Sequence, residues 1–362
     1  ENVGIGRNAL DANTTASNNT AIGDQAMTAN TEGHSNVAVG HTALQANTTA
    51  IKNTAIGASS LDANTTGSEN TAVGTSALGG NTTGTENVAV GVEALEANTT
   101  GGANTAIGLR ALEANTTAGN NTAVGVASMM VNTTGQFNTA VGGNALDANT
   151  TGGYNVAVGR VSLTSNTTGG SNVAVGWNTL ATNTTASNNV AVGDNSMASN
   201  TTGTFNVGVG ALSLDSNTTG NQNTAVGRHA LSSNTTADQN TAVGSNALGD
   251  NTTGADNTAV GDDALGSNTT ASNNTALGRG AGLNITTGHS NTFIGKSAGS
   301  SLTTGNTNVI VGVDCQASAV NGSGQIVMGD TVTGTGNDNF TFGAGSTDSN
   351  IAFGATSITA PS

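Results

Sequence analysis

The sequence predicts an all-β fold, a parallel β-solenoid with one 17-residue coil per repeat. Three observations predict it. Glycines recur every 17 residues from Gly6 to Gly329, and nearly all of them follow an aliphatic residue. Aromatic residues make up 2% and charged residues 8% of the chain, which excludes a helical or conventional mixed domain. Asn, Thr and Gly fill most remaining positions, as is typical of tight turns.

The repeat has a consensus, which we number from its glycine as position 0. Asn stands at −4, Thr or Val at −3, Ala at −2 and Val or Ile at −1, followed by Ala or Ser at +3, Leu or Met at +4 and Asn-Thr-Thr at +7 to +9. A unit this short gains a core only by stacking on its neighbours. Disordered chains do not hold aliphatic residues in register, and this argues against disorder.

Each coil is too short for two helices with their turns, but it accommodates two short strands. We expect the first strand on Asn-Thr-Ala-Val-Gly and the second on the Ala-Leu stretch. Alternation would place positions −3 and −1 on one face of the first strand, and −4, −2 and 0 on the other. The residues expected to carry the repeat are its glycines, the aliphatic residues before them and an Asn ladder: Gly6, Gly23, Gly40, Gly57, Gly74, Gly91, Gly108, Val73, Val90, Ile107, Asn70, Asn87 and Asn104.

Both faces of the first strand carry apolar or small residues, whereas a solvated outer face would carry charges. Ordering the backbone of one coil also costs more free energy than burying its few Val, Leu and Ala side chains returns. Burial between chains would close that gap. We therefore predict an obligate homo-oligomer, and we expect a homotrimer.

Asn-Thr-Thr triplets such as Asn13-Thr14-Thr15 are formally N-glycosylation acceptors. A turn at the Asn followed by a stacked threonine ladder explains their spacing without glycosylation, and Asn30-Thr31-Glu32 keeps the Asn while losing the acceptor. Adjacent threonines point to opposite faces, so each coil offers one outward Thr. A flat ice-binding surface would instead require Thr-x-Thr.

Chemistry-bearing residues are sparse, and we expect neither an enzyme, a cofactor nor a metal site. The four histidines lie at scattered repeat positions, without a nucleophile and carboxylate at a suitable spacing. The single thiol, Cys315, is expected to be a buried small residue, the alternative being a link between chains of the oligomer. A net charge of −15 disfavours nucleic acids and anionic membranes as partners. The sequence has no apolar run of bilayer length, so membrane insertion is not expected.

Exposed aromatic residues are the usual platforms for stacking sugars or binding proteins. Four lie on the regular coils: Phe137, Tyr154, Trp177 and Phe205. Three of them, Phe137, Tyr154 and Phe205, immediately precede the Asn of a coil and could cluster on one side. They are candidates for contact with a cell-surface glycan or a protein receptor, the alternative being isolated rings on an inert surface.

Two domains are expected, a shaft of about 20 coils over residues 1–330 and an irregular, tapering cap or junction over 331–362. In the cap, Phe340, Phe342 and Phe353 are expected to plug the open core. Because the chain begins within a repeat at Glu1, we expect it to be a fragment, a processed shaft or the ordered part of a longer protein.

The core motif, Asn70-Thr71-Ala72-Val73-Gly74, resembles the head repeats of trimeric autotransporter adhesins. The later stretch from Asn291 to Gly299, followed by Leu302-Thr303-Thr304-Gly305, is similar to the shafts of phage tail fibres and bacterial surface fibres, which often end in an endosialidase-type intramolecular chaperone. The resemblance implies a left-handed β-roll and an extracellular location, on a virion or a bacterial cell. It departs from those heads in its longer repeat.

Together these features predict a non-catalytic, extracellular fibre segment whose homotrimeric shaft presents or forms a host- or cell-binding surface. Two alternatives stay open. The coils could polymerise end to end as a self-assembling surface filament, or the solenoid could bind ice.

Overall fold

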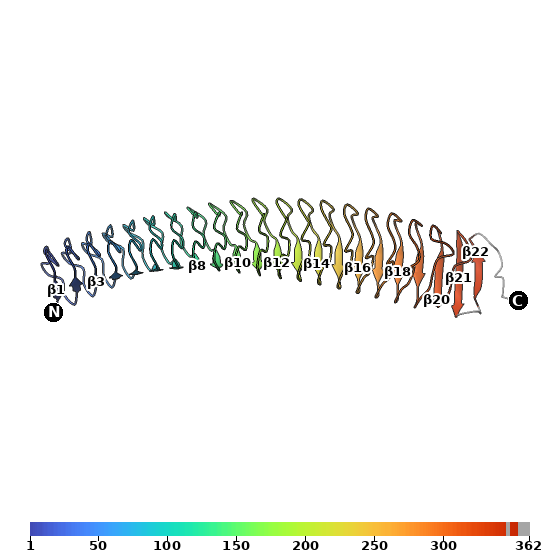
Figure 1. Ribbon diagram of the computed structural model, residues 1–362, viewed down its shortest axis with the longest axis horizontal. Coiled ribbons are helices and arrows are strands. Elements are labelled where there is room, and N and C mark those ends of the chain that lie inside the picture. Colours follow the sequence, from blue (N-terminus) through green and yellow to red (C-terminus); the bar gives the residue numbers. More distant parts are fainter. Residues whose placement is uncertain (345–347, 354–362) are drawn as a thin grey trace. The chain divides into compact units, whose positions relative to one another are not determined.

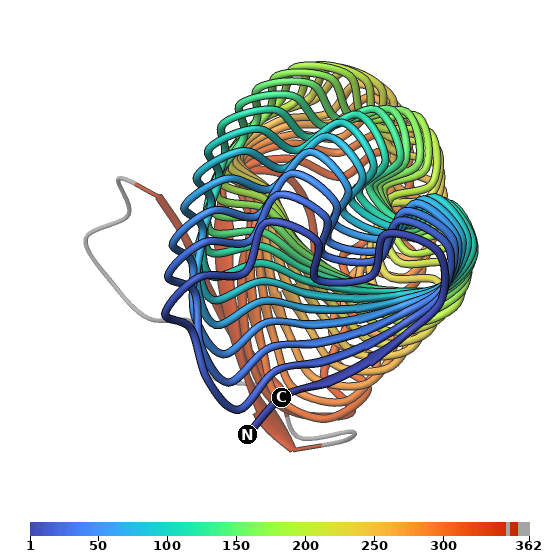
Figure 2. The ribbon, with the colours of Figure 1, turned by 90° about the vertical axis from the view of Figure 1, so that its left-hand side faces the viewer.

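The computed structural model describes residues 1–344 and 348–353, and the described chain is all-β, without a helix. The backbone divides into two compact units, Glu1–Ser187 and Asn188–Ser362. Each is a parallel β-solenoid, with coils that repeat every 17 residues, as predicted (Figure 1). Within each unit, successive coils follow nearly the same path when viewed along the stack (Figure 2).

The first unit contributes one three-residue strand per coil, and these strands pair in parallel without a register shift, for example Val88 with Thr105 and Val90 with Ile107. The strands are β1 (Val3–Ile5), β2 (Thr20–Ile22), β3 (Val37–Val39), β4 (Thr54–Ile56), β5 (Thr71–Val73), β6 (Val88–Val90), β7 (Thr105–Ile107), β8 (Thr122–Val124), β9 (Thr139–Val141), β10 (Val156–Val158) and β11 (Val173–Val175).

The second unit continues the pattern from β12 to β20 and ends differently, because β21 pairs parallel to β20 whereas β22 pairs antiparallel to β21. The strands are β12 (Val190–Val192), β13 (Val207–Val209), β14 (Thr224–Val226), β15 (Thr241–Val243), β16 (Thr258–Val260), β17 (Thr275–Leu277), β18 (Thr292–Ile294), β19 (Val309–Val311), β20 (Ile326–Asp330), β21 (Asn339–Ala344) and β22 (Ser349–Ala352).

The prediction of a second strand in each coil is wrong, because the Ala-Leu stretch forms turns. In the coil of Gly74, Ser76 and Leu78 adopt left-handed backbone conformations, with φ of 55° and 52°. This conformation turns successive amides in opposite directions, so that Ser76 N donates to Ala58 O of the preceding coil and Leu78 N to Ala94 O of the following one. Coils therefore stack through hydrogen bonds on this side without forming a sheet.

The repeat glycine is required for two reasons, and Gly74 shows both. Its φ is +141°, a region that residues with a Cβ rarely adopt. A Cβ at this position would also lie 2.4 Å from the carbonyl oxygen of Gly91 in the next coil. The glycines thus allow the backbones of neighbouring coils to approach closely where each strand ends.

The core of a regular coil is formed by Ala at −2, Ala or Ser at +3 and Leu or Met at +4. In the coil of Gly74 these are Ala72, Ala77 and Leu78, all fully buried. Val73, Val90 and Ile107, which the sequence analysis expected to carry the repeat, lie on the outward face of their strands. They leave the core of their own chain, because strand alternation points them away from Ala72 and its equivalents.

Two ladders of buried asparagines line the coil interior, and the expected Asn ladder is confirmed. At −4, Asn70 Oδ1 accepts a hydrogen bond from Asn87 N at 3.0 Å, while Asn70 Nδ2 donates to Gly84 O at 2.9 Å. At +7, Asn98 Nδ2 donates to Asn81 Oδ1 at 2.8 Å and to Gly101 O at 2.9 Å. Amides that satisfy one another in this way make a polar core tolerable.

Phe340, Phe342 and Phe353 were expected to plug the open core, and this prediction is wrong. Phe340 and Phe342 pair with Ile326 and Met328, so they continue the outward positions −3 and −1, while Thr341 occupies the buried position between them. Phe353 is 50% exposed. Strand alternation explains this outcome, because the outward register of β20 passes unchanged to β21. Residues 345–347 and 354–362 of the predicted cap lie outside the described residues.

Candidate interaction surface

The outward residues of the strands form one uncharged surface in each unit, which we call the strand face. It consists of positions −3 and −1, and from Val3 to Met328 every residue there is Val, Thr, Ile, Leu or Met. Their side chains are accessible, with Ile56 at 41% and Ile107 at 40% exposure. A regular, uncharged and accessible surface of this kind is unusual for a chain that remains alone in water.

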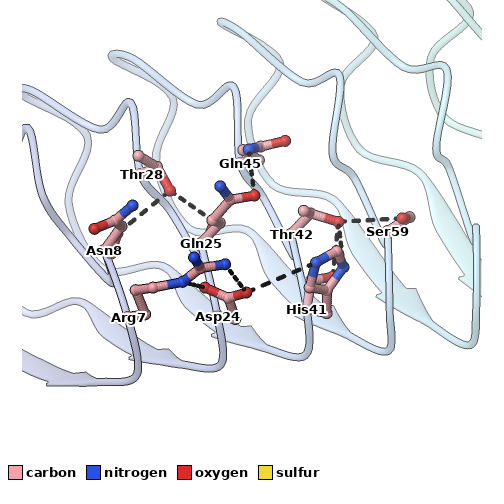
Figure 3. A network of polar contacts seen from close by, with 9 residues as sticks. All are labelled: Arg7, Asn8, Asp24, Gln25, Thr28, His41, Thr42, Gln45 and Ser59. Atoms are coloured by element: carbon pink, nitrogen blue, oxygen red, sulfur yellow. Dashed lines mark hydrogen bonds and ion pairs between the residues drawn. The ribbon is translucent and has the colours of Figure 1, made fainter.

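Charged side chains occur instead on the other outward positions, including the two edges of the strand face. We call position +12, before the strand, the leading edge and position +1, after the strand, the trailing edge. On the trailing edge, Arg7 donates to both carboxylate oxygens of Asp24 at 2.9 and 2.8 Å, and His41 Nε2 lies 4.0 Å from Asp24 Oδ2 (Figure 3). The hydrogen bond from Arg7 lowers the pKa of Asp24.

The four aromatic residues proposed for contact with a glycan or a protein all lie on these edges. Phe137 and Tyr154 occupy the leading edge of neighbouring coils and stack with ring centroids 5.1 Å apart, so two of the three rings expected to cluster lie together. Trp177 is on the trailing edge of the same unit and is 49% exposed, and Phe205 is on the leading edge of the second unit. The rings therefore flank the strand face.

One acidic cluster in the first unit was not predicted from the sequence. Carboxylate oxygens of Glu93, Glu96 and Glu113 lie within 4.8 Å of one another. Arg110 occupies the same cluster, with Nε 3.6 Å from Glu93 and 2.5 Å from Glu113. Burial, followed by the charges of Glu93 and Glu113, raises the pKa of Glu96. The spacing of Glu96 and Glu113 by one repeat was the available signal, but a guanidinium accounts for the cluster without a metal.

The Asn-Thr-Thr segment forms the predicted turn and ladder. Asn98 at +7 is fully buried, so its side chain is inaccessible to a glycosylating enzyme in the folded chain. Thr99 Oγ1 donates to Thr116 O of the next coil at 3.0 Å, whereas Thr100 at +9 is exposed. Nearly every coil thus presents one outward threonine at +9, and we call this row the threonine file. Glu32 interrupts it.

Cys315 is buried, as expected, and its Sγ lies 3.3 Å from Gly329 O. Burial raises the pKa of this thiol. Over residues 1–344 and 348–353, the side chains leave no pocket, and no helix is long and apolar enough to cross a membrane.

No known protein family matches the sequence, and no curated protein matches it.

Proposed function

We propose that this chain is a segment of an extracellular fibre, located on a virion or a bacterial cell, that acts mechanically and not as an enzyme. Three copies would associate through their strand faces into a shaft of left-handed β-rolls that presents or forms a cell-binding surface. The resemblance of Asn70-Thr71-Ala72-Val73-Gly74 to adhesin head repeats supports the trimer, the hand of the coil and the location.

The observation that carries the proposal is the distribution of charge. Charged residues occur at most other outward positions of the coil, including the leading and trailing edges, but are absent from −3 and −1 between Val3 and Met328. Selection for solubility alone would admit charges on an accessible face. Burial against identical faces explains why Val, Ile and Thr are kept there, since the interior of an obligate interface resembles a protein core.

The test places charge on the strand face. The double variant Val73→Lys/Val90→Lys should lower the mass of the particle, because two lysines per chain would be buried without partners. The control is Thr83→Lys/Thr100→Lys, on the exposed threonine file of neighbouring coils, which should leave the mass unchanged. Light scattering after size exclusion gives the mass, and circular dichroism checks that both variants fold. An unchanged mass for the folded strand-face variant would overturn the proposal.

Ice binding is a second candidate, favoured by the threonine file alone. The strand face offers no Thr-x-Thr array, because position −1 is Val, Ile, Leu or Met in every coil from Ile5 to Met328. A file of outward hydroxyls and methyls, such as those of Thr83 and Thr100, could still order water. Ice crystals that grow faceted in the presence of the chain would support this candidate, and crystals of unaltered shape would remove it.

A further inference from the structure

One stretch of the trailing edge in the first unit is aliphatic. In three consecutive coils position +1 is Val92, Leu109 and Val126, with exposures of 44%, 47% and 55%. Arg110 N donates to Val92 O at 3.0 Å and Ala127 N to Leu109 O at 2.9 Å, so the coils are stacked in register here. With coils about 4.8 Å apart, the three side chains form an accessible apolar strip about 10 Å long. We call it the aliphatic row.

The fold does not require aliphatic residues at this position. In the other coils of the unit, position +1 holds side chains of every kind, namely Arg7, Asp24, His41, Ala58, Thr75, Gly143, Arg160 and Trp177. Charged residues therefore stand on this edge on both sides of the aliphatic row, whereas none stands on the strand face between Val3 and Met328. The row thus lies outside the surface that we propose to be buried between copies.

Positions +2 and +5 lie next to the trailing edge. Figure 3 shows positions +1, +2 and +5 of one coil near one another, at Asp24, Gln25 and Thr28. Beside the aliphatic row, these positions carry Glu93 at +2 and Glu96 and Glu113 at +5, and their carboxylate oxygens lie within 4.8 Å of one another. We call these three residues the glutamate cluster. The apolar strip is therefore bordered on one side by carboxylates.

The glutamate cluster has an excess of negative charge. Arg110 contacts Glu93 and Glu113, but it is the only Lys or Arg in the sequence between Lys52 and Arg160. One guanidinium thus faces three carboxylates, and the raised pKa of Glu96 reflects burial and repulsion by the other two. An added cation would relieve this repulsion. The surface is complementary to a ligand that is apolar on one side and cationic beside it.

We propose that the aliphatic row and the glutamate cluster form a docking site for a basic, amphipathic helix of another protein. Its apolar side chains pack on the row, and its Lys or Arg side chains pair with the carboxylates. A helix rises about 5.4 Å per turn, close to the coil spacing of about 4.8 Å, so one apolar residue per turn meets one aliphatic residue per coil. An extended strand presents a residue to the same side only every 6.7 Å or so.

Other occupants fit this surface less well. The seven Lys and Arg residues of the chain lie in seven different coils, so no segment of it is both basic and amphipathic, and a second copy does not supply the helix. Anionic lipid headgroups would be repelled by the glutamate cluster and by the net charge of −15. The proposal goes beyond the proposed function, since it concerns an edge outside the strand face.

A synthetic amphipathic peptide of about 18 residues, with Leu on one face of its helix and Lys on the other, is the probe. Its affinity for the full chain is measured by fluorescence anisotropy at low and high salt. We expect binding that weakens with salt. Both Leu109→Asn and Glu96→Gln/Glu113→Gln should weaken it about tenfold or more, because each removes one half of the site. A peptide of the same composition in scrambled order should bind more weakly than the amphipathic one.

Matched control variants lie in the second unit. Val313→Asn replaces an isolated aliphatic residue of the trailing edge that is 44% exposed, and Asp262→Asn/Asp263→Asn removes an acidic pair. Neither should change the affinity for the peptide. Circular dichroism checks that every variant folds, which the variety of side chains at +1 leads us to expect.

Four outcomes would overturn the inference. They are absence of binding, equal affinity of the amphipathic and scrambled peptides, equal losses in the site and control variants, and binding to phosphatidylserine vesicles that Leu109→Asn abolishes. The last of these would assign the aliphatic row to a membrane. None of them involves the mass of the particle, so they leave the proposed function standing, and a monomeric mass would overturn that function without affecting this site.

Discussion

The regular coils and the coils around Phe293 fill the same cross-section in different ways. In regular coils the core consists of Ala at −2, Leu or Met at +4 and Asn at +7. Around Phe293, the ring replaces the Ala, glycines replace the Leu at 282 and 299, and Ile285 and Leu302 replace the Asn. A Cβ at Gly299 would lie 2.4 Å from the Phe293 ring. The exchange shows that the coil conserves packed volume and not residue identity.

The exchange also has a cost, which appears at the boundary between the two kinds of core. Asn268 Nδ2 donates to Asn251 Oδ1 at 2.7 Å, but its own Oδ1 is buried without a partner. The next residue in the ladder is Ile285, which has no donor to offer. The +7 ladder therefore ends inside the solenoid with one amide oxygen unpaired, which costs free energy.

The largest effect is expected for Phe293→Ala. This variant restores the consensus Ala at −2, but Gly282 and Gly299 remain at +4, where regular coils have Leu or Met. We expect a loss of about 3–5 kcal/mol in the free energy of unfolding, because the cavity opens against Gly282 and Gly299. Denaturant titration measures it.

The matched variant is Phe293→Ala/Gly299→Leu, which should recover part of the loss, because Leu is the regular residue at +4 in this left-handed conformation. Gly299→Leu alone should destabilise the chain, since it forces a side chain into the ring. If the two changes are additive, the exchange account is wrong.

A smaller effect should distinguish the middle of the Asn ladder from its end. Asn234→Leu removes the donor to Asn217 Oδ1 at 2.9 Å and the acceptor of Asn251 Nδ2 at 3.0 Å, and should cost about 2–3 kcal/mol. Asn268→Leu likewise leaves Asn251 Oδ1 without its donor. It also removes Asn268 Oδ1, which is already unpaired, so the loss in the free energy of unfolding should be about 0–1 kcal/mol. Equal losses in denaturant titration would contradict this view of the boundary.

The smallest effect concerns a carboxylate in the regular coils that has one unpaired oxygen. Asp215 Oδ1 is buried without a partner, and burial raises the pKa of this side chain. Since the folded-state pKa lies above the unfolded value, ionisation destabilises the fold at neutral pH, and the penalty disappears as the pH falls below the unfolded pKa. Asp215→Asn should raise the Tm slightly at neutral pH and leave it unchanged in acid. A gain that persists in acid would point to another cause.

The features of this structure that could be predicted from the sequence are those that recur in every repeat. Period, parallel pairing, strand position and the Asn ladder follow from residues that recur, as at Asn70 and Gly74. The second strand was misassigned because Ala77-Leu78 has strand-like composition, although Leu78 is held at a φ of 52° by stacking that local propensity does not reveal. The absence of β-branched residues at +4 was a usable signal.

Strand alternation in the sequence locates the strand face, but it does not show whether this face is buried in the core or lies on the surface of the chain. Val73 and Ile107 have the composition of core residues, and only the structure shows that their own chain leaves them outside. The stacking of Phe137 on Tyr154 followed from their shared position at +12, whereas the cluster of Glu93 with Glu113 and Arg110 depends on side-chain conformations that spacing does not determine.

The mass of the unmodified chain in dilute solution, measured by light scattering after size exclusion, tests the central claim most directly. The account predicts a particle of three chains of 34.9 kDa each, because a strand face without charges should be covered by other copies. Very large species would favour an end-to-end filament. A stable monomer at all accessible concentrations would contradict the account and leave the strand face exposed to solvent.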